Sequence, residues 1–321
     1  MARDGKILVI GAAGQVGTDL VPALRRDYGA ANVVATVHRK PGSPSLADGP
    51  VEPLDVTDKA ALLRLVERHG IDRIYHLPAL MSAAGEADPE TAWRLNMVAL
   101  KDVLDLAVER RLRQVFFPSS IAVFGPTTPQ QRTPQRTVLE PTTIYGVTKL
   151  AGENLCNYYF HRHKLDVRGL RYPGLVSYKN FSGGGTTDYS VEMFLSAKSD
   201  GRYRCFVRPD TRLPLLYMDD AIEATVQLMQ ADASRLTVRT SYNLGGLDFT
   251  AGELAEAVAT RVPGFTCEFV PDHRQAIADS WPDSIDDSDA RRDWDWQPTY
   301  ELPQLVDAML RGVGLRSLSE K

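Results

Sequence analysis

The segment that most restricts how this chain can fold is the glycine-rich run Gly11-Ala12-Ala13-Gly14-Gln15-Val16-Gly17. It follows a buried-strand pattern at residues 7–10 and precedes a helical pattern at 18–26. Glycine permits a tight turn and a close approach of backbone to a pyrophosphate, and the helix N-terminus attracts phosphates. Glycines also make plain structural turns, but the strand before and the helix after favour a dinucleotide-binding turn. The residues expected to bind the cofactor here are Gly11, Gly14, Gln15, Val16 and Gly17.

Apolar strand patterns alternate with amphipathic helical patterns through the first half of the chain. Strands are expected at 7–10, 33–37, 51–54, 71–77 and 114–118, and helices at 18–26, 59–69 and 89–110. This alternation predicts an α/β fold with a doubly wound parallel sheet of the Rossmann type, which binds ligands at the carboxyl ends of its strands.

The pattern becomes less regular after residue 171, where Gly and Pro increase. A strand at 215–218, a helix at 220–230 and a further sheet strand at 242–244 follow. We expect a dinucleotide-binding domain of residues 1–172 with 215–246, and a smaller C-terminal substrate-binding domain of residues 173–214 with 247–321. Asp219 and Asp220 are expected to cap the helix after them.

The composition excludes several classes of protein. A net charge of -4 over 321 residues gives no basic field for nucleic acid. No apolar run approaches the roughly 20 residues of a membrane span. The three cysteines, Cys156, Cys205 and Cys267, form no metal pattern and no disulfide framework. Because a strand pattern begins close to the N-terminus, we expect no signal peptide and a cytoplasmic location.

Tyr145 and Lys149 form a Tyr-x-x-x-Lys pair, whose members share one face of a helix. A neighbouring ammonium group and an oxidised nicotinamide both favour phenolate and lower the pKa of the tyrosine, which lets it accept a hydroxyl proton. Ser119 and Ser120 end the strand at 114–118, at the ligand edge of the sheet, and can orient the reacting oxygen. A surface Tyr–Lys pair is the alternative, but the glycine turn and the serines upstream favour a catalytic triad of Ser120, Tyr145 and Lys149.

The end of the second strand bears on the choice of cofactor. An acidic residue there would bind the adenine ribose and favour NAD, but the chain has Val37 followed by His38, Arg39 and Lys40. These basic side chains can pair with a 2′-phosphate or form a solvated loop. Asp55, after the third strand, is a candidate contact for the adenine.

These motifs resemble the extended short-chain dehydrogenase/reductase superfamily, and most closely the short-chain type of L-threonine 3-dehydrogenases. The resemblance covers residues 6 to about 310. The segments specific to the threonine branch are Ser82-Ala83-Ala84-Gly85-Glu86, Thr186-Thr187-Asp188-Tyr189 and Trp281-Pro282. The chain departs from the family's pattern at Val37, where an Asp is usual, and at Pro78, where a small residue is usual.

The resemblance implies roles for further residues. Ser120, Tyr145 and Lys149 match the family's catalytic groups, and Asn96 is expected to be a structural hydrogen-bonding residue near the sheet. The implied substrate-binding residues are Ser82, Ser119, Ser120, Tyr145, Thr186, Thr187 and Trp281. The implied cofactor-binding residues beyond the glycine turn are His38, Arg39, Asp55, Leu77, Ala79, Tyr145, Lys149 and Tyr172. Turn chemistry is the alternative for the threonines, and a packing anchor is the alternative for Trp281.

The resemblance implies oxidation of the β-hydroxyl group of L-threonine to 2-amino-3-ketobutyrate, with NAD as the cofactor. The residues at the end of the second strand point the other way, so we expect both NAD and NADP to bind, with NAD slightly favoured. The resemblance also implies a homodimer that pairs through the helices near 89–110 and 143–163. One alternative is a nucleotide-sugar 4-epimerase or dehydratase. That class commonly places an Arg-Asp pair where this chain has Leu213-Pro214, although Arg212 is adjacent. A second alternative is a protein that senses NAD(P) without catalysis, which would not need the triad.

Overall fold

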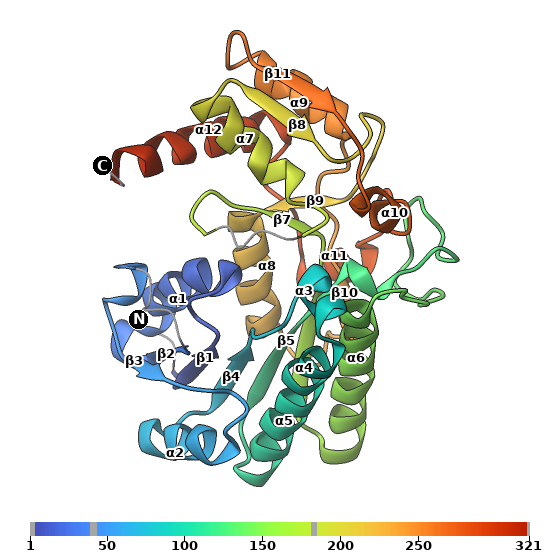
Figure 1. Ribbon diagram of the computed structural model, residues 1–321. Coiled ribbons are helices and arrows are strands. Elements are labelled where there is room, and N and C mark those ends of the chain that lie inside the picture. Colours follow the sequence, from blue (N-terminus) through green and yellow to red (C-terminus); the bar gives the residue numbers. More distant parts are fainter. Residues whose placement is uncertain (1–3, 39–43, 181–184, 320–321) are drawn as a thin grey trace.

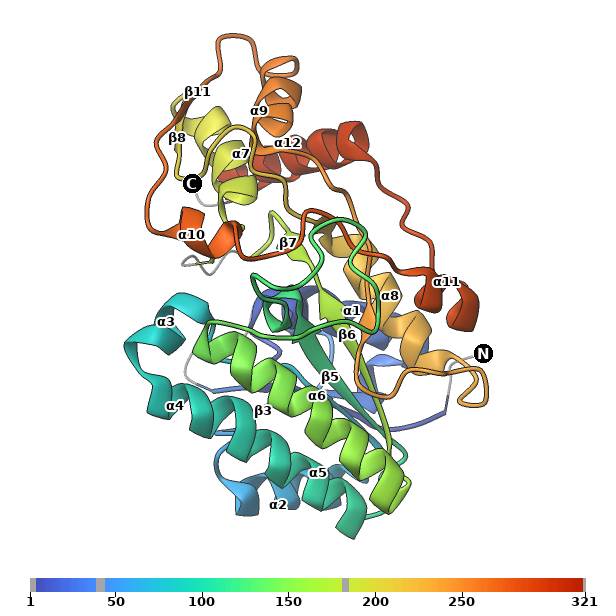
Figure 2. The same cartoon turned by 90° about the vertical axis from the view of Figure 1, so that its right-hand side faces the viewer.

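The structure is a computed structural model that describes residues 4–38, 44–180 and 185–319. Figures 1 and 2 show a lower part built on one sheet, and an upper part that contains the C-terminal helix. None of the helices within these described ranges is long and apolar enough to cross a membrane.

Seven parallel strands form the main sheet in the order β10-β6-β5-β4-β1-β2-β3. Their bounds are β1 (Ile7–Ile10), β2 (Val33–Val37), β3 (Val51–Pro53), β4 (Arg73–His76), β5 (Gln114–Ser120), β6 (Asp166–Tyr172) and β10 (Tyr242–Asn243). The strand order reverses between β1 and β4, and such a reversal opens a crevice at the carboxyl ends of the strands. The predicted doubly wound α/β fold is confirmed.

Helices cover both faces of this sheet. One face packs against α1 (Gln15–Tyr28), α8 (Met218–Gln230) and α11 (Ser288–Trp294), and the other against α2 (Lys59–His69), α5 (Ala99–Glu109) and α6 (Ile144–His163). Side chains alternate across β1, so that Ile7 and Val9 join the first core and Leu8 and Ile10 the second. Buried on both faces, β1 is apolar throughout, as is usual for a central parallel strand. Two 3₁₀ turns, η1 (Ala30–Asn32) and η2 (Pro44–Leu46), flank β2.

The upper part has a core of its own. It contains α7 (Tyr189–Ser199), β8 (Arg202–Cys205), α9 (Ala251–Ala259), β11 (Thr266–Phe269), α10 (Arg274–Ala278) and α12 (Leu302–Ser319). A short sheet of β7 (Gly174–Val176) and β9 (Leu215–Tyr217) lies between the two parts (Figure 1). The upper core also includes Tyr145 and the 3₁₀ turn η4 (Ile121–Val123) of the lower part. The two parts therefore meet where the triad was predicted, and the expected domain boundaries stay a prediction.

The helix expected over residues 89–110 is not continuous. It consists of α4 (Pro89–Trp93), a π-helical turn η3 (Arg94–Val98) and α5, and the short α3 (Ser82–Ala87) precedes it. Asn96 lies in the π turn, where its side chain accepts from Leu80 N at 2.8 Å and donates to Leu80 O at 3.2 Å and to Thr148 Oγ1 at 3.0 Å. Asn96 therefore ties this segment to α6, which agrees with the expected structural role.

The expected helix cap at Asp219 and Asp220 is wrong. Tyr217 occupies the N-cap position of α8, and neither carboxylate caps the helix. Asp220 instead accepts from the backbone N–H groups of Thr299 at 3.1 Å and of Tyr300 at 3.0 Å. This buried carboxylate therefore holds the segment that leads into α12.

Candidate active site

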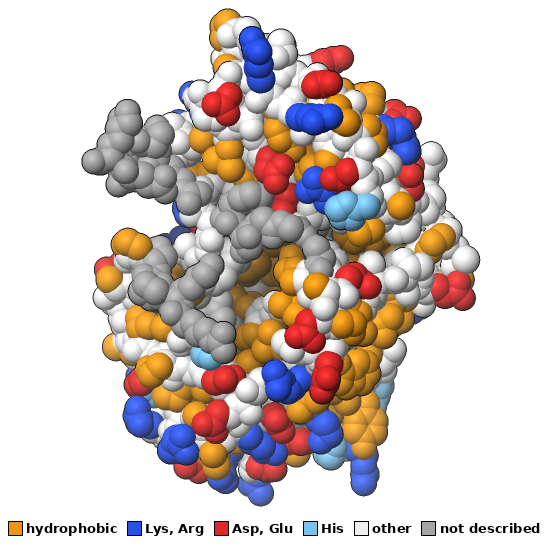
Figure 3. Space-filling model, viewed as in Figure 1, with side chains coloured by type: hydrophobic (Ala, Val, Ile, Leu, Met, Phe, Trp, Pro, Cys, Tyr) orange, Lys and Arg blue, Asp and Glu red, His pale blue; other side chains and the backbone are white. Residues whose placement is uncertain are grey.

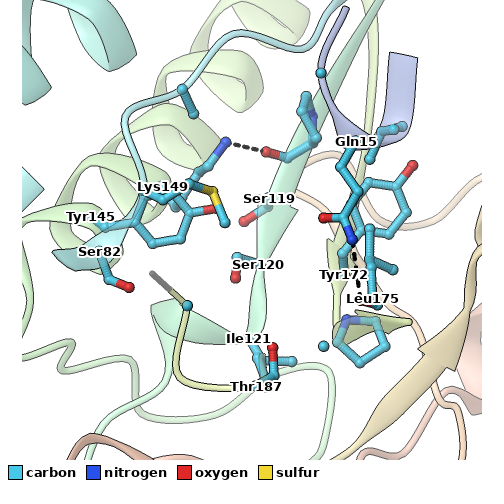
Figure 4. A pocket seen from close by; sticks show the side chains of 18 of the residues that line it. Gln15, Ser82, Ser119, Ser120, Ile121, Tyr145, Lys149, Tyr172, Leu175 and Thr187 are labelled. Carbon is cyan, nitrogen blue, oxygen red and sulfur yellow. Dashed lines mark hydrogen bonds between the residues drawn. The ribbon is translucent and has the colours of Figure 1, made fainter. Parts of the chain in front are cut away.

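A cavity of about 350 Å³ opens at the carboxyl ends of β1, β4, β5 and β6, below the upper part of the molecule. Figure 3 shows the surface hollowed between the two parts. In Figure 4, Ser82 and Tyr145 lie on one side of the cavity, Gln15 and Tyr172 on the other, and Ser120 between them. The cavity is lined by sixteen predicted site residues, namely Gly11, Gly14, Gln15, Val16, Gly17, Leu77, Ala79, Ser82, Ser119, Ser120, Tyr145, Lys149, Tyr172, Thr186, Thr187 and Trp281.

The glycine turn fits a dinucleotide. Gly11 has φ +81°, and a Cβ atom at Gly17 would lie 2.6 Å from Ala12 Cα, so neither position accepts a larger residue without strain. Helix α1 begins at Gln15 with no side-chain cap and no acidic residue in its first turn. Its first N–H groups can therefore bind a diphosphate at the cavity wall, with the positive end of the helix dipole behind them. Pro78, the departure from the family pattern, lies against Gly11, where a Cβ atom would meet Pro78 N at 3.2 Å.

The end of β2 lies apart from the cavity. His38 and Asp55 do not line it, and they pair with each other at 3.5 Å as half-exposed side chains. Asp55 also accepts from Thr57 N at 3.0 Å and from Thr57 Oγ1 at 2.7 Å. Arg39 and Lys40 lie outside the described residues. Of the three basic residues after Val37, the structure therefore places only His38.

Helix α6 carries both members of the Tyr-x-x-x-Lys pair. Thr143 Oγ1 caps the helix by accepting from Gly146 N at 3.1 Å, which fixes the first turn with Tyr145 on the cavity side. Lys149 Nζ lies 5.5 Å from the centre of the Tyr145 ring and donates to Pro118 O at 2.6 Å. Ser120 follows Pro118 by two residues at the end of β5, and it lines the same cavity as Tyr145 and Lys149. The triad is thus assembled in one place.

Burial controls the protonation of this triad. It raises the pKa of Tyr145 to about 12, although the nearby Ser120 side chain acts in the opposite direction. It also lowers the pKa of Lys149 to about 8, against the nearby Cys156 and Glu153. The sequence predicts a lowered pKa for this tyrosine, but in the protein without cofactor the loss of solvent around the phenol raises it. A bound oxidised nicotinamide supplies a hydride acceptor and a positive charge, and that charge favours the phenolate.

Further hydroxyl groups line the cavity around the triad. Ser82 begins α3 and is 6% exposed, and Thr186 is 3% exposed in the turn before α7. Trp281 lines the cavity and also belongs to the upper core, so the two predicted roles, substrate contact and packing anchor, are compatible. Ser119 differs from the other predicted residues because its hydroxyl group donates to Glu153 at 2.5 Å, on the side of α6.

Asp188 is a cavity residue that the sequence analysis did not single out. Its Oδ2 accepts from Gly185 N at 2.6 Å, and burial raises its pKa to about 6. It is the one acidic side chain, and Lys149 the one basic side chain, among the described residues that line the cavity. The sequence does contain an indication of this role, because Asp188 belongs to the segment Thr186-Thr187-Asp188-Tyr189 on which the resemblance partly rests.

A glycine turn on a doubly wound sheet, beside a Ser–Tyr–Lys triad, defines the extended short-chain dehydrogenase/reductase class. The chain belongs to the NAD dependent epimerase/dehydratase family, whose model matches residues 7–245. Within this family it is 44% identical to an uncharacterized epimerase/dehydratase of Staphylococcus haemolyticus. The aligned 310 residues cover 96% of this chain and 97% of the relative.

Solved structures give a closer indication of the branch. The chain is similar to a GalE-like L-threonine dehydrogenase from Cupriavidus necator, with 50% identity, a TM-score of 0.93 and coverage of 96% and 99% of the two chains. It is also similar to a monomeric L-threonine 3-dehydrogenase from a metagenome, with 45% identity, a TM-score of 0.91 and coverage of 97% and 99%.

Proposed function

We propose that this protein oxidises the β-hydroxyl group of L-threonine to the ketone, giving 2-amino-3-ketobutyrate, with NAD as the working cofactor. The observation that carries the proposal is the pairing of the triad with Asp188 in one cavity. A carboxylate recognises the substrate's ammonium group, while the triad engages its hydroxyl group. The similarity to L-threonine dehydrogenases over nearly the whole chain supports the same substrate.

The chain's own residues divide the chemistry between them. Ser120 hydrogen-bonds the β-hydroxyl oxygen and orients it toward Tyr145. The Tyr145 phenolate takes the hydroxyl proton as the hydride leaves the β-carbon for the cofactor. Lys149, anchored on Pro118 O at 2.6 Å, stabilises the phenolate with its charge. Trp281, which is 8% exposed, limits the access of water.

A nucleotide-sugar epimerase or dehydratase is the main alternative. Such an enzyme must hold a second diphosphate, for which cationic side chains are the usual partners. Among the described residues that line the cavity, no arginine is present and Lys149 is committed to the triad. Arg212 pairs instead with Glu253 at 3.2 Å and is 36% exposed. These contacts favour a small amino acid over a sugar nucleotide.

The test is to mix the protein with NAD⁺ or NADP⁺ and to follow nicotinamide absorbance on addition of each candidate substrate. Threonine-dependent reduction is expected, and 2-aminobutyrate, which lacks the hydroxyl group, should give none. Turnover of a UDP-sugar without net reduction would support the epimerase instead. Tight cofactor binding with no turnover of either would indicate a sensing protein.

We also propose a homodimer that acts in the cytoplasm. Four apolar side chains of the α4, η3 and α6 layer are at least two-fifths exposed, namely Trp93, Val98, Val147 and Tyr158. Figure 2 shows this layer of helices on one side of the molecule. The metagenomic relative is monomeric, so overall similarity does not decide assembly, and the exposed side chains carry this proposal. The three free cysteines fit a reducing compartment.

A further inference from the structure

Helix α6 carries a buried carboxylate one turn beyond Lys149. The side chain of Glu153 is 1% exposed and that of its partner Arg171 is 3% exposed. Arg171 donates to both Glu153 oxygens, from Nε at 2.8 Å and from Nη2 at 2.7 Å. Ser119 Oγ donates to the same carboxylate at 2.5 Å. These hydrogen bonds all lead to the ends of β5 and β6 beside the cavity.

These contacts join three elements that carry the predicted site. Ser119 on β5 stands between Pro118, whose carbonyl holds Lys149, and Ser120 of the triad. Arg171 on β6 precedes Tyr172 of the cavity wall, and it donates from Nη1 to Gln135 O and to Asn243 Oδ1, both at 3.1 Å. The position of α6 along β5 is thus set by two linked anchors, the Lys149–Pro118 bond and the Glu153–Ser119 bond.

Glu153 also bears on the charge of Lys149. The Lys149 ammonium is 4% exposed and lies 5.0 Å from the centre of the Phe117 ring. Burial lowers its pKa to about 8, and interactions with Cys156 and Glu153 act in the opposite direction. Burial also raises the pKa of Cys156, so its thiol is neutral near pH 7, and the carboxylate one turn from Lys149 is that of Glu153, paired with Arg171.

Other titratable groups also lie on α6 or against it. They include Tyr145 on α6 itself, His76 on β4, Arg171 on β6, Glu86 on α3, which accepts from Ile144 N, and Asp105 on α5, which accepts from Tyr159 Oη. Burial and the charge of Lys149 lower the pKa of His76 to about 3, so His76 is neutral. Arg171 forms the ion pair with Glu153 described above.

We propose that Glu153 is a positioning residue for the reaction: through Ser119 it locks the Lys149 turn of α6 to the end of β5, and it places a carboxylate one helical turn from the Lys149 ammonium. The inference rests on the proposed oxidoreductase function. An ordinary buried ion pair, which stabilises the fold and does nothing more, is the competing explanation.

The test separates the effect of the Glu153 charge on Lys149 from the contribution of Glu153 to the stability of the fold. Glu153→Gln keeps the shape and removes the charge, Glu153→Asp keeps the charge, and Glu109→Gln makes the same change at an exposed position on α5. Because removing one partner of a buried pair can unfold a protein, the double variant Glu153→Gln/Arg171→Gln offers a neutral amide pair. The protonation of Lys149 is read by NMR on protein labelled with ¹³C at lysine Cε, without cofactor or substrate. Lys149→Ala identifies the resonance.

In Glu153→Gln the pKa of Lys149 should fall by about one unit. It should fall less in the double variant, because the positive charge of Arg171 is removed as well, and it should stay close to the parent value in Glu153→Asp and Glu109→Gln. The acid limb of kcat should move to higher pH in the Gln variants, because Tyr145 loses the neighbouring charge. An unchanged Lys149 titration together with a lower melting temperature would overturn the proposal, as would failure of both Gln variants to fold. If threonine is not the substrate, the NMR shift still appears, so the two proposals fail separately.

Discussion

Tyr145 is the residue on which the proposed chemistry depends most directly. Its phenol is 9% exposed and its pKa is raised to about 12, so it needs positive charge nearby to act as a base near neutral pH. Tyr145→Phe should lower kcat by about 10² to 10⁴-fold and leave cofactor binding unchanged, as checked by steady-state kinetics and a cofactor titration. Lys149→Ala should move the pH profile to higher pH. A near-normal kcat in the Phe variant would remove Tyr145 from the mechanism.

Asp188 should determine the affinity for an amino-acid substrate. Burial raises its pKa to about 6, so the carboxylate is charged above that pH and becomes neutral as the pH falls through it. We expect KM for threonine to rise below about pH 6 in the parent protein. Asp188→Asn should raise KM about tenfold or more at pH 8 and abolish this dependence, since a charge-assisted bond contributes about 1.5–3 kcal/mol. Asp200→Asn, an exposed change at the end of α7, is the matched control. An unaltered KM in the Asn variant would show that the ammonium group binds elsewhere.

Val37 should influence the choice of cofactor. It ends β2, where an acidic side chain would accept from the ribose hydroxyl groups and repel a 2′-phosphate. We expect both NAD⁺ and NADP⁺ to be used by the parent, with NAD⁺ slightly preferred. Val37→Asp should shift the ratio of kcat/KM values toward NAD⁺ by about tenfold, and Arg39→Ala should change it as well if that side chain pairs with the phosphate. No shift with Val37→Asp would mean that this position does not face the ribose.

At the scale of elements, patterns of apolar residues predicted the strands and helices around the glycine turn, but not β6. This strand contains Arg168 and Arg171, which depress its hydrophobicity. Both side chains are nevertheless buried, because Arg168 pairs with Asp166 at 2.7 Å and Arg171 with Glu153 at 2.7 Å. Asp166 stands two residues from Arg168 on the same strand, whereas Glu153 lies on α6, and a pattern of apolar residues registers neither pairing.

In the candidate site, too, some residues could be predicted from local motifs and others depend on tertiary packing. Residues next to a motif, such as Ser120 and Tyr145, were identified because local spacing and the sheet edge place them together. Asp188 and the inward turn of Ser119 toward Glu153 depend on how α6, β5 and the segment before α7 pack. The cap expected at Asp220 failed for the same reason, since its partners lie about 80 residues further on.

Asp220 provides a test of how the elements are joined. Its carboxylate accepts from the backbone of Thr299 and Tyr300, so it fastens the segment before α12 to the start of α8. Asp220→Ala should lower the free energy of unfolding by about 1–3 kcal/mol, because buried N–H groups lose their acceptor. Denaturant unfolding measures the change. Glu223→Ala, an exposed change on the same helix, should stay within about 0.5 kcal/mol of the parent. Equal losses in both variants would contradict this account of Asp220.

At the scale of the whole molecule, the exposed apolar side chains of α4, η3 and α6 should be covered by a second copy of the chain. Sedimentation should give twice the 35.5 kDa mass of one chain. Tyr158→Glu, on α6, should shift the protein toward the single-chain mass, whereas Val51→Glu, at the edge strand β3, should not. A parent mass near that of one chain would reject the dimer.

The cavity owes its chemistry to both parts of the molecule. The lower part supplies the glycine turn and the triad, and the upper part and the segment before it supply Trp281, Thr186 and Asp188. The central claim is that these groups together remove a hydride from the β-carbon of threonine.

Threonine carrying deuterium at the β-carbon tests this claim most directly. After incubation with NAD⁺, mass spectrometry of the reduced cofactor should show one deuterium per cofactor formed, together with 2-amino-3-ketobutyrate or its decarboxylation product, and Tyr145→Phe should form almost none. Reduced cofactor without deuterium, or no reduction with threonine in the presence of either NAD⁺ or NADP⁺, would contradict the account.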